Sequence, residues 1–315
     1  MNISPFVQFA SANALQIGDK FSRTVLSAVS GASAGICHDG TRYVVVGDSG
    51  LVMTSTDGGT WSKVTTNISS VNLVKVSYGA GIYVAVTNDS KIYSSTDLAT
   101  WTLRQTTSGT AGVVFGGGVF VAYGGEIYSS TNGTSWTLRT NPGGGFSRGA
   151  YVNGRFLLTE IFAFSNQFKI AHSTDGATWT GVTINANVNC TGIAYWDSAY
   201  FLVGNRSGSN NKYLVRSTNL TSWTALLVST DATASFGLSM TTNRLVIMAP
   251  LGIFATAPNA NAQEPLGYGL ASPNNSLSIV TAAADVVFAD NKIVAVSYSG
   301  SNPIILRSSA VELAN

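Results

Sequence analysis

The chain contains the heptapeptide Ser55-Thr56-Asp57-Gly58-Gly59-Thr60-Trp61 and repeats it, with small changes, four more times. The shared pattern is Ser-Thr-Asp/Asn-x-x-Thr/Ser-Trp, and the later copies end at Trp101, Trp136, Trp179 and Trp223. The five tryptophans are therefore 40, 35, 43 and 44 residues apart. A period of this size is typical of proteins that build one small sheet from each repeat.

A second pattern precedes each of these boxes and consists of two apolar strands joined by a tight turn. The turns contain Asp39-Gly40, Gly116-Gly117 and Asn153-Gly154, residue types that tolerate positive φ. Two further units, at residues 237–256 and 285–308, have the same order of apolar strands and turns but lack the tryptophan. Seven units in all predict an all-β fold, a seven-bladed β-propeller of four-stranded antiparallel blades.

The ends of the chain predict how the ring of blades closes. The last unit ends at residues 311–315, where an outer strand would begin, whereas residues 18–26 resemble residues 59–65 of the first box and its outer strand. We therefore expect residues 20–28 to form the N-terminal outer strand of the last blade. The predicted organisation is an N-terminal arm at residues 1–17 and one propeller at residues 18–315.

The box resembles the Asp-box, or BNR, repeat of sialidase-like propellers, and the resemblance covers residues 35–310. It implies a hairpin between the third and fourth strands of each blade, on the outer rim. We expect the Asp or Asn to accept backbone N–H bonds, the hydroxyl residue three positions later to tie the other side, and the tryptophan to cover the apolar face of the blade. The box residues given this structural role are Asp57, Trp61, Asp97, Trp101, Asn132, Trp136, Asp175, Trp179, Asn219 and Trp223.

The composition excludes some classes of partner. Only 10 % of residues are charged, against roughly 25 % in ordinary soluble domains, and the net charge is +2. No long-range field attracts nucleic acid or anionic lipid, so we expect neither as a partner. The N-terminal residues do not resemble a secretory signal, and no run of 18 apolar residues predicts a membrane span. Surface polarity must come from Ser, Thr, Asn and Gly, which suits a particle-bound or extracellular surface.

The residues needed for catalysis do not form a recognisable set. The sialidase resemblance would imply an arginine cluster, yet the Arg-Ile-Pro signature is absent and only Arg148 is expected near an inner strand. His38 and His172 have no partner at ligand spacing, and Cys37 and Cys190 are expected to be free thiols. Asn replaces Asp in two boxes, which a metal site would not tolerate. We expect a non-enzymatic protein without cofactor or metal.

A candidate binding face follows from the loops between second and third strands. Asp48, Asp89, Glu126 and Glu160 fall at these loops in the first four repeats, where they form an acidic arc for a cation or sugar hydroxyls, or remain ordinary solvated charges. Two irregular connections extend the candidate face. Residues 160–169 carry the aromatic Phe164, and the polar segment 204–212 carries Arg206.

Low charge without an export signal favours a structural or adhesion protein of a phage virion, tail- or capsid-associated. It would be made in the host cytoplasm, would contact other virion proteins, and would contact a host surface glycan or receptor. One alternative is a carbohydrate-binding, lectin-like propeller or a glycosidase. The other is an exported assembly factor similar to the Asp-box propellers of photosystem II assembly, although the basic patch usual in those proteins is missing here.

Overall fold

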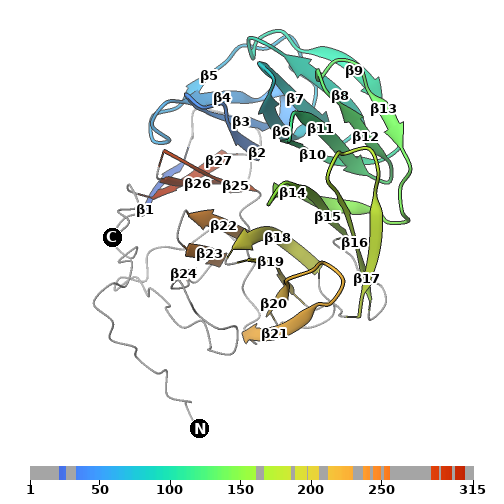
Figure 1. Cartoon of the computed structure of the whole chain (residues 1–315). Helices are drawn as coiled ribbons and strands as arrows, with labels where there is room; N and C mark the ends of the chain where they lie inside the picture. Colours follow the sequence, from blue (N-terminus) through green and yellow to red (C-terminus); the bar gives the residue numbers. More distant parts are fainter. Residues whose placement is uncertain are drawn as a thin grey trace.

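The computed structural model describes residues 21–25, 33–160, 167–185, 189–196, 198–205, 212–229, 237–241, 244–249, 252–255, 285–290, 292–299 and 302–308. These residues form strands β1–β27 and one 3-10 turn, η1 (Asp48–Gly50), arranged as seven antiparallel sheets (Figure 1). No helix in these ranges is long and apolar enough to cross a membrane.

Each of the first five sheets is a meander of four consecutive strands. The strands of the first three sheets are β2 (Ser33–His38), β3 (Tyr43–Gly47), β4 (Val52–Ser55) and β5 (Ser62–Lys63); β6 (Leu73–Gly79), β7 (Ile82–Thr87), β8 (Lys91–Ser95) and β9 (Thr102–Thr106); β10 (Thr110–Gly116), β11 (Val119–Gly124), β12 (Ile127–Ser130) and β13 (Thr137–Arg139). The next two are β14 (Phe146–Val152), β15 (Arg155–Glu160), β16 (Phe168–Ser173) and β17 (Thr180–Ile184); β18 (Asn189–Trp196), β19 (Ala199–Asn205), β20 (Lys212–Ser217) and β21 (Thr224–Ser229).

The sixth and seventh sheets complete the set. They are β22 (Gly237–Thr241), β23 (Arg244–Ala249) and β24 (Gly252–Ala255), and then β25 (Asp285–Ala289), β26 (Lys292–Ser299) and β27 (Asn302–Ser308) with β1 (Phe21–Val25). The predicted all-β propeller and its seven repeats are thereby confirmed. The sixth blade has three strands among the described residues.

The first strands of the blades form the inner ring of the propeller. Strands β2, β6, β10, β14, β18, β22 and β25 contact one another in this order, and β25 contacts β2 again, so the ring is closed. Because every blade is an antiparallel meander, the loops between second and third strands lie at the end of the ring where the first strands begin. We call this end the entry face. The hairpins between first and second strands, and the boxes, lie at the opposite end, the box face.

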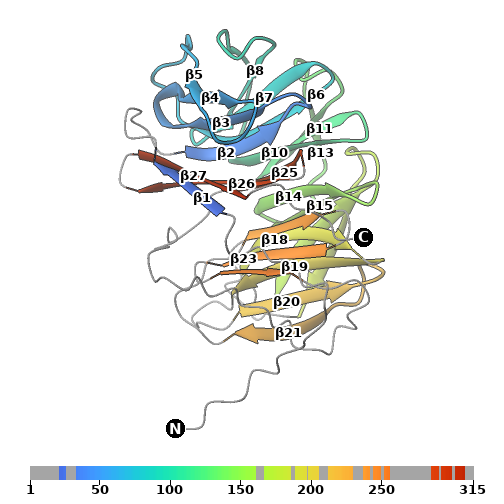
Figure 2. The same ribbon diagram turned by 90° about the vertical axis from the view of Figure 1, so that its left-hand side faces the viewer.

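The seventh blade is closed by the beginning of the chain. Strand β1 pairs antiparallel with β27, with Phe21 opposite Ser308 and Val25 opposite Ile304. Figures 1 and 2 both show the blue β1 lying beside the red β27. The predicted closure by residues 20–28 is confirmed over residues 21–25. The predicted arm, residues 1–17, lies outside the described residues.

Side chains also join the seventh blade to the first. The Tyr43 hydroxyl donates to the carbonyl of Ala289 over 2.7 Å, and His38 Nε2 lies 3.1 Å from Asp290 Oδ2. No partner for His38 was predicted from the sequence, because Asp290 lies on the other side of the closure and 252 positions away in the chain. His38 therefore has a structural position at the junction of the two ends.

Each box is a turn held by its own side chains. In the first copy, Asp57 Oδ1 accepts the N–H groups of Gly59 and Thr60, both over 2.8 Å. The buried Ser55 hydroxyl donates to Asp57 over 2.9 Å and accepts the Gly58 N–H over 2.8 Å. The same contacts recur around Asp97, Asn132, Asp175 and Asn219. The boxes join third to fourth strands, as predicted.

Two hydroxyls complete the turn, the expected one and a second one. Thr60, three positions after Asp57, donates to Asp57 over 3.4 Å as expected. The first Ser of the box makes shorter bonds, because it is buried at the end of the third strand and faces the turn. An invariant Ser at this place thus satisfies a buried backbone N–H in every copy.

The box tryptophans pack between blades, which refines the expectation that each covers its own blade. Trp101 belongs to an apolar cluster that combines Val44 and Val46 of the first blade with Tyr83 and Ala85 of the second. The other four tryptophans likewise lie between their own blade and the preceding one. Four indoles donate to the carbonyl three residues earlier, whereas Trp136 Nε1 has no hydrogen-bond partner among the described residues.

The Asp boxes should make stability depend on pH below the ordinary Asp range. Backbone N–H donors hold the pKa of Asp57, Asp97 and Asp175 below its ordinary value, to about 2 for Asp175. Because the folded pKa is depressed, the stabilisation is fully present above the unfolded value of 3.8 and is lost as the pH falls to about 2. We expect the triple variant Asp57→Asn, Asp97→Asn, Asp175→Asn to unfold with a flatter pH dependence in this window, measured by urea titration.

The chain supplies its own reciprocal control for this experiment. Asn132 and Asn219 hold the same turn without a charge, so Asn132→Asp with Asn219→Asp should steepen the pH dependence. An unchanged slope in both variants would contradict the role assigned to the box carboxylates.

Candidate functional site

The four acidic residues expected at one face do lie on the entry face. Asp48 follows β3, Asp89 lies between β7 and β8, Glu126 between β11 and β12, and Glu160 ends β15. Phe164 and Arg206, the other two residues of the candidate face, lie outside the described residues. The loop assignment from the sequence was therefore right for the first four blades.

Three of these carboxylates bind the protein's own loops. Asp89 accepts from Thr87 Oγ1 at 2.5 Å and Lys91 Nζ at 2.6 Å, and Lys91 holds the pKa of Asp89 below its ordinary value. Glu126 accepts the Ser108 N–H over 2.8 Å, and Glu160 accepts the Lys169 N–H over 2.8 Å. Among the described residues, no three acidic, histidine or cysteine side chains form a group that could hold a metal ion. The hydrogen bonds of Asp89, Glu126 and Glu160 hold loops of the entry face in place.

A different set of charges lies on the inner ring, at one register position. Five first strands carry a register shift, and the residues directly after it are Gly35, Lys75, Gly112, Arg148 and Gly192. Gly237 and Asp285 occupy the same position in the sixth and seventh blades. Four glycines and three charged residues thus share one level near the entry face. At two of the glycines the space of a side chain is already filled, by the Lys75 backbone beside Gly35 and by the Tyr123 phenol beside Gly112.

Two of the three charges are paired with each other. Asp285 forms an ion pair with Lys75, and its second oxygen accepts the Ile36 N–H over 3.0 Å. These contacts join the seventh, first and second blades. A Cβ on the intervening Gly35 would lie only 2.9 Å from Lys75 Cα, so the close approach of β2 and β6 requires glycine there. The Lys75–Asp285 pair therefore belongs to the ring closure.

Arg148 is the third charge of this level. It is half-buried, Nη1 donates to the Ser147 carbonyl over 3.0 Å, and no carboxylate of the described residues lies within ion-pair distance. Burial raises the pKa of the Tyr123 phenol and of the Cys190 thiol, and the Arg148 charge partly offsets both rises. A half-buried guanidinium without a carboxylate can bind an anionic group of a partner.

The sequence identified Arg148 as the one arginine near an inner strand but missed Lys75 and Asp285. A signal for them existed, since each lies four residues before the residue that enters the first hairpin turn, as Arg148 does. Aligning the repeats on these turns would have placed the three charges in one column with four glycines. The pairing between blades was beyond such an alignment.

Comparisons with known proteins establish the fold. No protein-family model and no curated protein matches the chain. Among solved structures, YCF48 bound to D1 peptide is 13 % identical with a TM-score of 0.68, covering 92 % of this chain and 97 % of that one. Catalytically inactive virginiamycin B lyase from Staphylococcus aureus with quinupristin is 14 % identical with a TM-score of 0.70, covering 91 % and 99 %. YCF48 from Cyanidioschyzon merolae is 15 % identical with a TM-score of 0.64, covering 92 % and 98 %.

These similar structures are β-propellers whose blades are four-stranded and antiparallel. One holds a peptide, and another is a lyase. Identities this low establish the fold of the present chain and leave its activity to be argued from its own residues.

Proposed function

We propose that the chain is a non-enzymatic binding propeller of a phage virion, which holds another protein on its entry face. It belongs to the Asp-box type by its five boxes. Arg148 carries the proposal, because this inner-ring charge has no carboxylate within ion-pair distance among the described residues, whereas Lys75 and Asp285 at the same level pair with each other. A carboxylate of the partner, on a side chain or at a chain end, is the group it would bind.

Three further observations support this proposal. Three of the four acids of the entry face, Asp89, Glu126 and Glu160, accept hydrogen bonds from the protein's own backbone or side chains, which is typical of residues with a structural role. A similar propeller holds a peptide. The low proportion of charged residues, 10 %, suits the surface of a particle.

The test is incorporation into particles. We expect the chain to sediment with virions purified from a lysate, and Arg148→Ala to lower its amount per particle about tenfold, since losing one member of a close charge pair weakens an interface strongly. Quantitative mass spectrometry of gradient-purified particles measures this ratio.

Arg139→Ala is the matched control, because Arg139 lies on the outer strand β13 and its Nε donates to Ser129 within its own blade. It removes one positive charge away from the entry face and should leave incorporation unchanged. A chain that stays in the soluble fraction would contradict the virion role, and equal incorporation of both variants would contradict the role of Arg148.

A further inference from the structure

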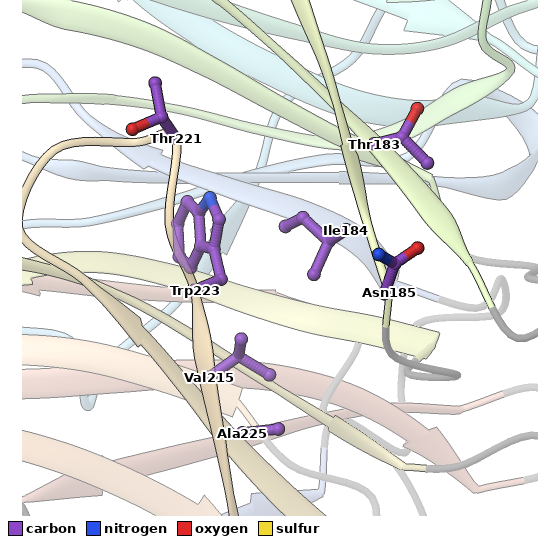
Figure 3. Close-up of a pocket in the computed structure, with 7 residues that line it drawn as sticks. All are labelled: Thr183, Ile184, Asn185, Val215, Thr221, Trp223 and Ala225. Carbon is purple, nitrogen blue, oxygen red and sulfur yellow. The ribbon is translucent and has the colours of Figure 1, made fainter.

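A small cavity opens between the fourth and fifth blades, away from the entry-face site. Its volume is about 190 Å³, and it lies between the outer strand β17 and the box and outer strand β21 of the next blade. Trp223 forms one wall and Ile184 faces it, as Figure 3 shows. Three neutral polar side chains, Thr183, Asn185 and Thr221, are exposed at its rim.

Small residues of the fifth blade create this cavity. Val215 and Ala225 are paired across β20 and β21 and line it. In the second blade the same paired positions hold Tyr93 and Leu103, and in the third they hold Tyr128 and Leu138. The fifth blade thus holds a smaller pair than the second and third blades; the fourth blade also has a small pair, Ala171 and Gly181, but there Pro142 fills the space beside Gly181.

The preceding blade also leaves the space open. Asn67, six residues after Trp61, donates to the Trp101 carbonyl over 3.1 Å and accepts the Trp101 N–H over 2.8 Å, so it covers that tryptophan. Asn185 lies six residues after Trp179 and is its counterpart, but its Oδ1 accepts from Gln167 Nε2 over 2.7 Å instead. Trp101 is accordingly buried, whereas Trp223, like the other three box tryptophans, is half-buried.

We propose that this cavity binds one neutral pyranose ring of a glycan. A rigid indole beside aliphatic side chains offers an apolar surface for the C–H face of a sugar, and the indole is fixed because its N–H donates to the Leu220 carbonyl over 2.9 Å. The hydroxyl and amide groups of Thr183, Asn185 and Thr221 can exchange hydrogen bonds with sugar hydroxyls. No lining residue is ionisable, so a neutral sugar is favoured over a charged one.

The size of the cavity agrees with a single ring. Sites for drug-sized ligands occupy roughly 300–1,000 Å³, and this cavity is smaller. A ligand of about 12 heavy atoms in an open site is expected to bind with a Kd on the order of 1 mM. The sugar site is independent of the proposed protein partner, since it lies on the outer side of two blades and shares no residue with the inner ring.

Saturation-transfer NMR with the methyl glycosides of glucose, galactose, mannose, N-acetylglucosamine and fucose tests the proposal. We expect at least one to bind saturably, and Ala225→Leu to weaken it at least about tenfold by filling the cavity. This variant is compatible with the fold, because leucine already occupies the position in the second and third blades. Thr221→Ala should weaken sugar binding less than Ala225→Leu, because it removes only one hydroxyl. The variant keeps the box turn, since the backbone N–H of residue 221 still donates to Asn219.

Leu103→Ala is the matched control, since Leu103 holds the same position in the second blade and is 46 % exposed. It should leave sugar binding unchanged. Absence of binding by every glycoside, or binding that survives Ala225→Leu, would overturn the sugar site. Neither result bears on Arg148, whose effect on particles is read out separately.

Discussion

Removal of residues 1–28 should destabilise the propeller more than any other short deletion. The deletion leaves β27 without its neighbour β1 and removes a five-residue antiparallel ladder. At about 0.5–1.5 kcal/mol for each net hydrogen bond, the loss amounts to roughly 3–5 kcal/mol, and we expect a melting temperature lower by about 10 °C. Aggregation should follow, because β27 would then be an edge strand with unpaired backbone N–H and C=O groups.

The control deletion ends at residue 17 and keeps β1, so its melting temperature should match that of the full chain. Thr24→Pro tests the same ladder at constant length, because proline removes the N–H of a residue that pairs with Ile305. Ser11→Pro lies outside the ladder and is its counterpart. The melting temperatures are measured by differential scanning calorimetry. If the variant without residues 1–28 melts at the same temperature as the full chain, the side-chain contacts between the first and last blades are sufficient to close the ring.

Most of the fold was predictable because its causes are local and repeated. Each box holds its turn with residues no more than three apart, so five copies could be recognised without any tertiary information. Closure was predictable for a related reason, since residues 18–26 carry the pattern of an outer strand that the last unit lacks. The pattern indicated the partner strand as well as the existence of the pairing.

The functional positions were less predictable because they depend on contacts between blades. Asp285 meets Lys75 across 210 positions, with Gly35 between them; an alignment of the repeats puts the three in one column but does not indicate that two of them form an ion pair. The cavity beside Trp223 likewise depends on two blades at once. The fifth blade has the small pair Val215 and Ala225 next to the cavity, and in the fourth blade Asn185 binds Gln167 instead of covering Trp223. The acids, by contrast, were placed on the right face, but their hydrogen bonds to nearby backbone were not apparent from their charge.

The second large effect is expected at Trp101, the most enclosed of the box tryptophans. Its exposed fraction is 3 %, it packs between the first two blades, and Asn67 binds both its N–H and its carbonyl. Trp101→Ala removes an indole that fills this space and donates to the Leu98 carbonyl over 2.8 Å. We expect a loss of about 3–5 kcal/mol in the free energy of unfolding, measured by urea titration.

Trp223→Ala is the matched comparison, because the two tryptophans occupy equivalent boxes and make the same indole hydrogen bond, over 2.8 and 2.9 Å. Trp223 borders the open cavity, so its removal enlarges a space that is already open to water. Fewer packing contacts are therefore lost than in Trp101→Ala. Its cost should be lower than that of Trp101→Ala by at least about 1 kcal/mol. If both variants lose the same free energy of unfolding, the box turn rather than packing between blades determines the contribution of each tryptophan to stability. Trp223 would then not differ from the other box tryptophans in a way that indicates binding.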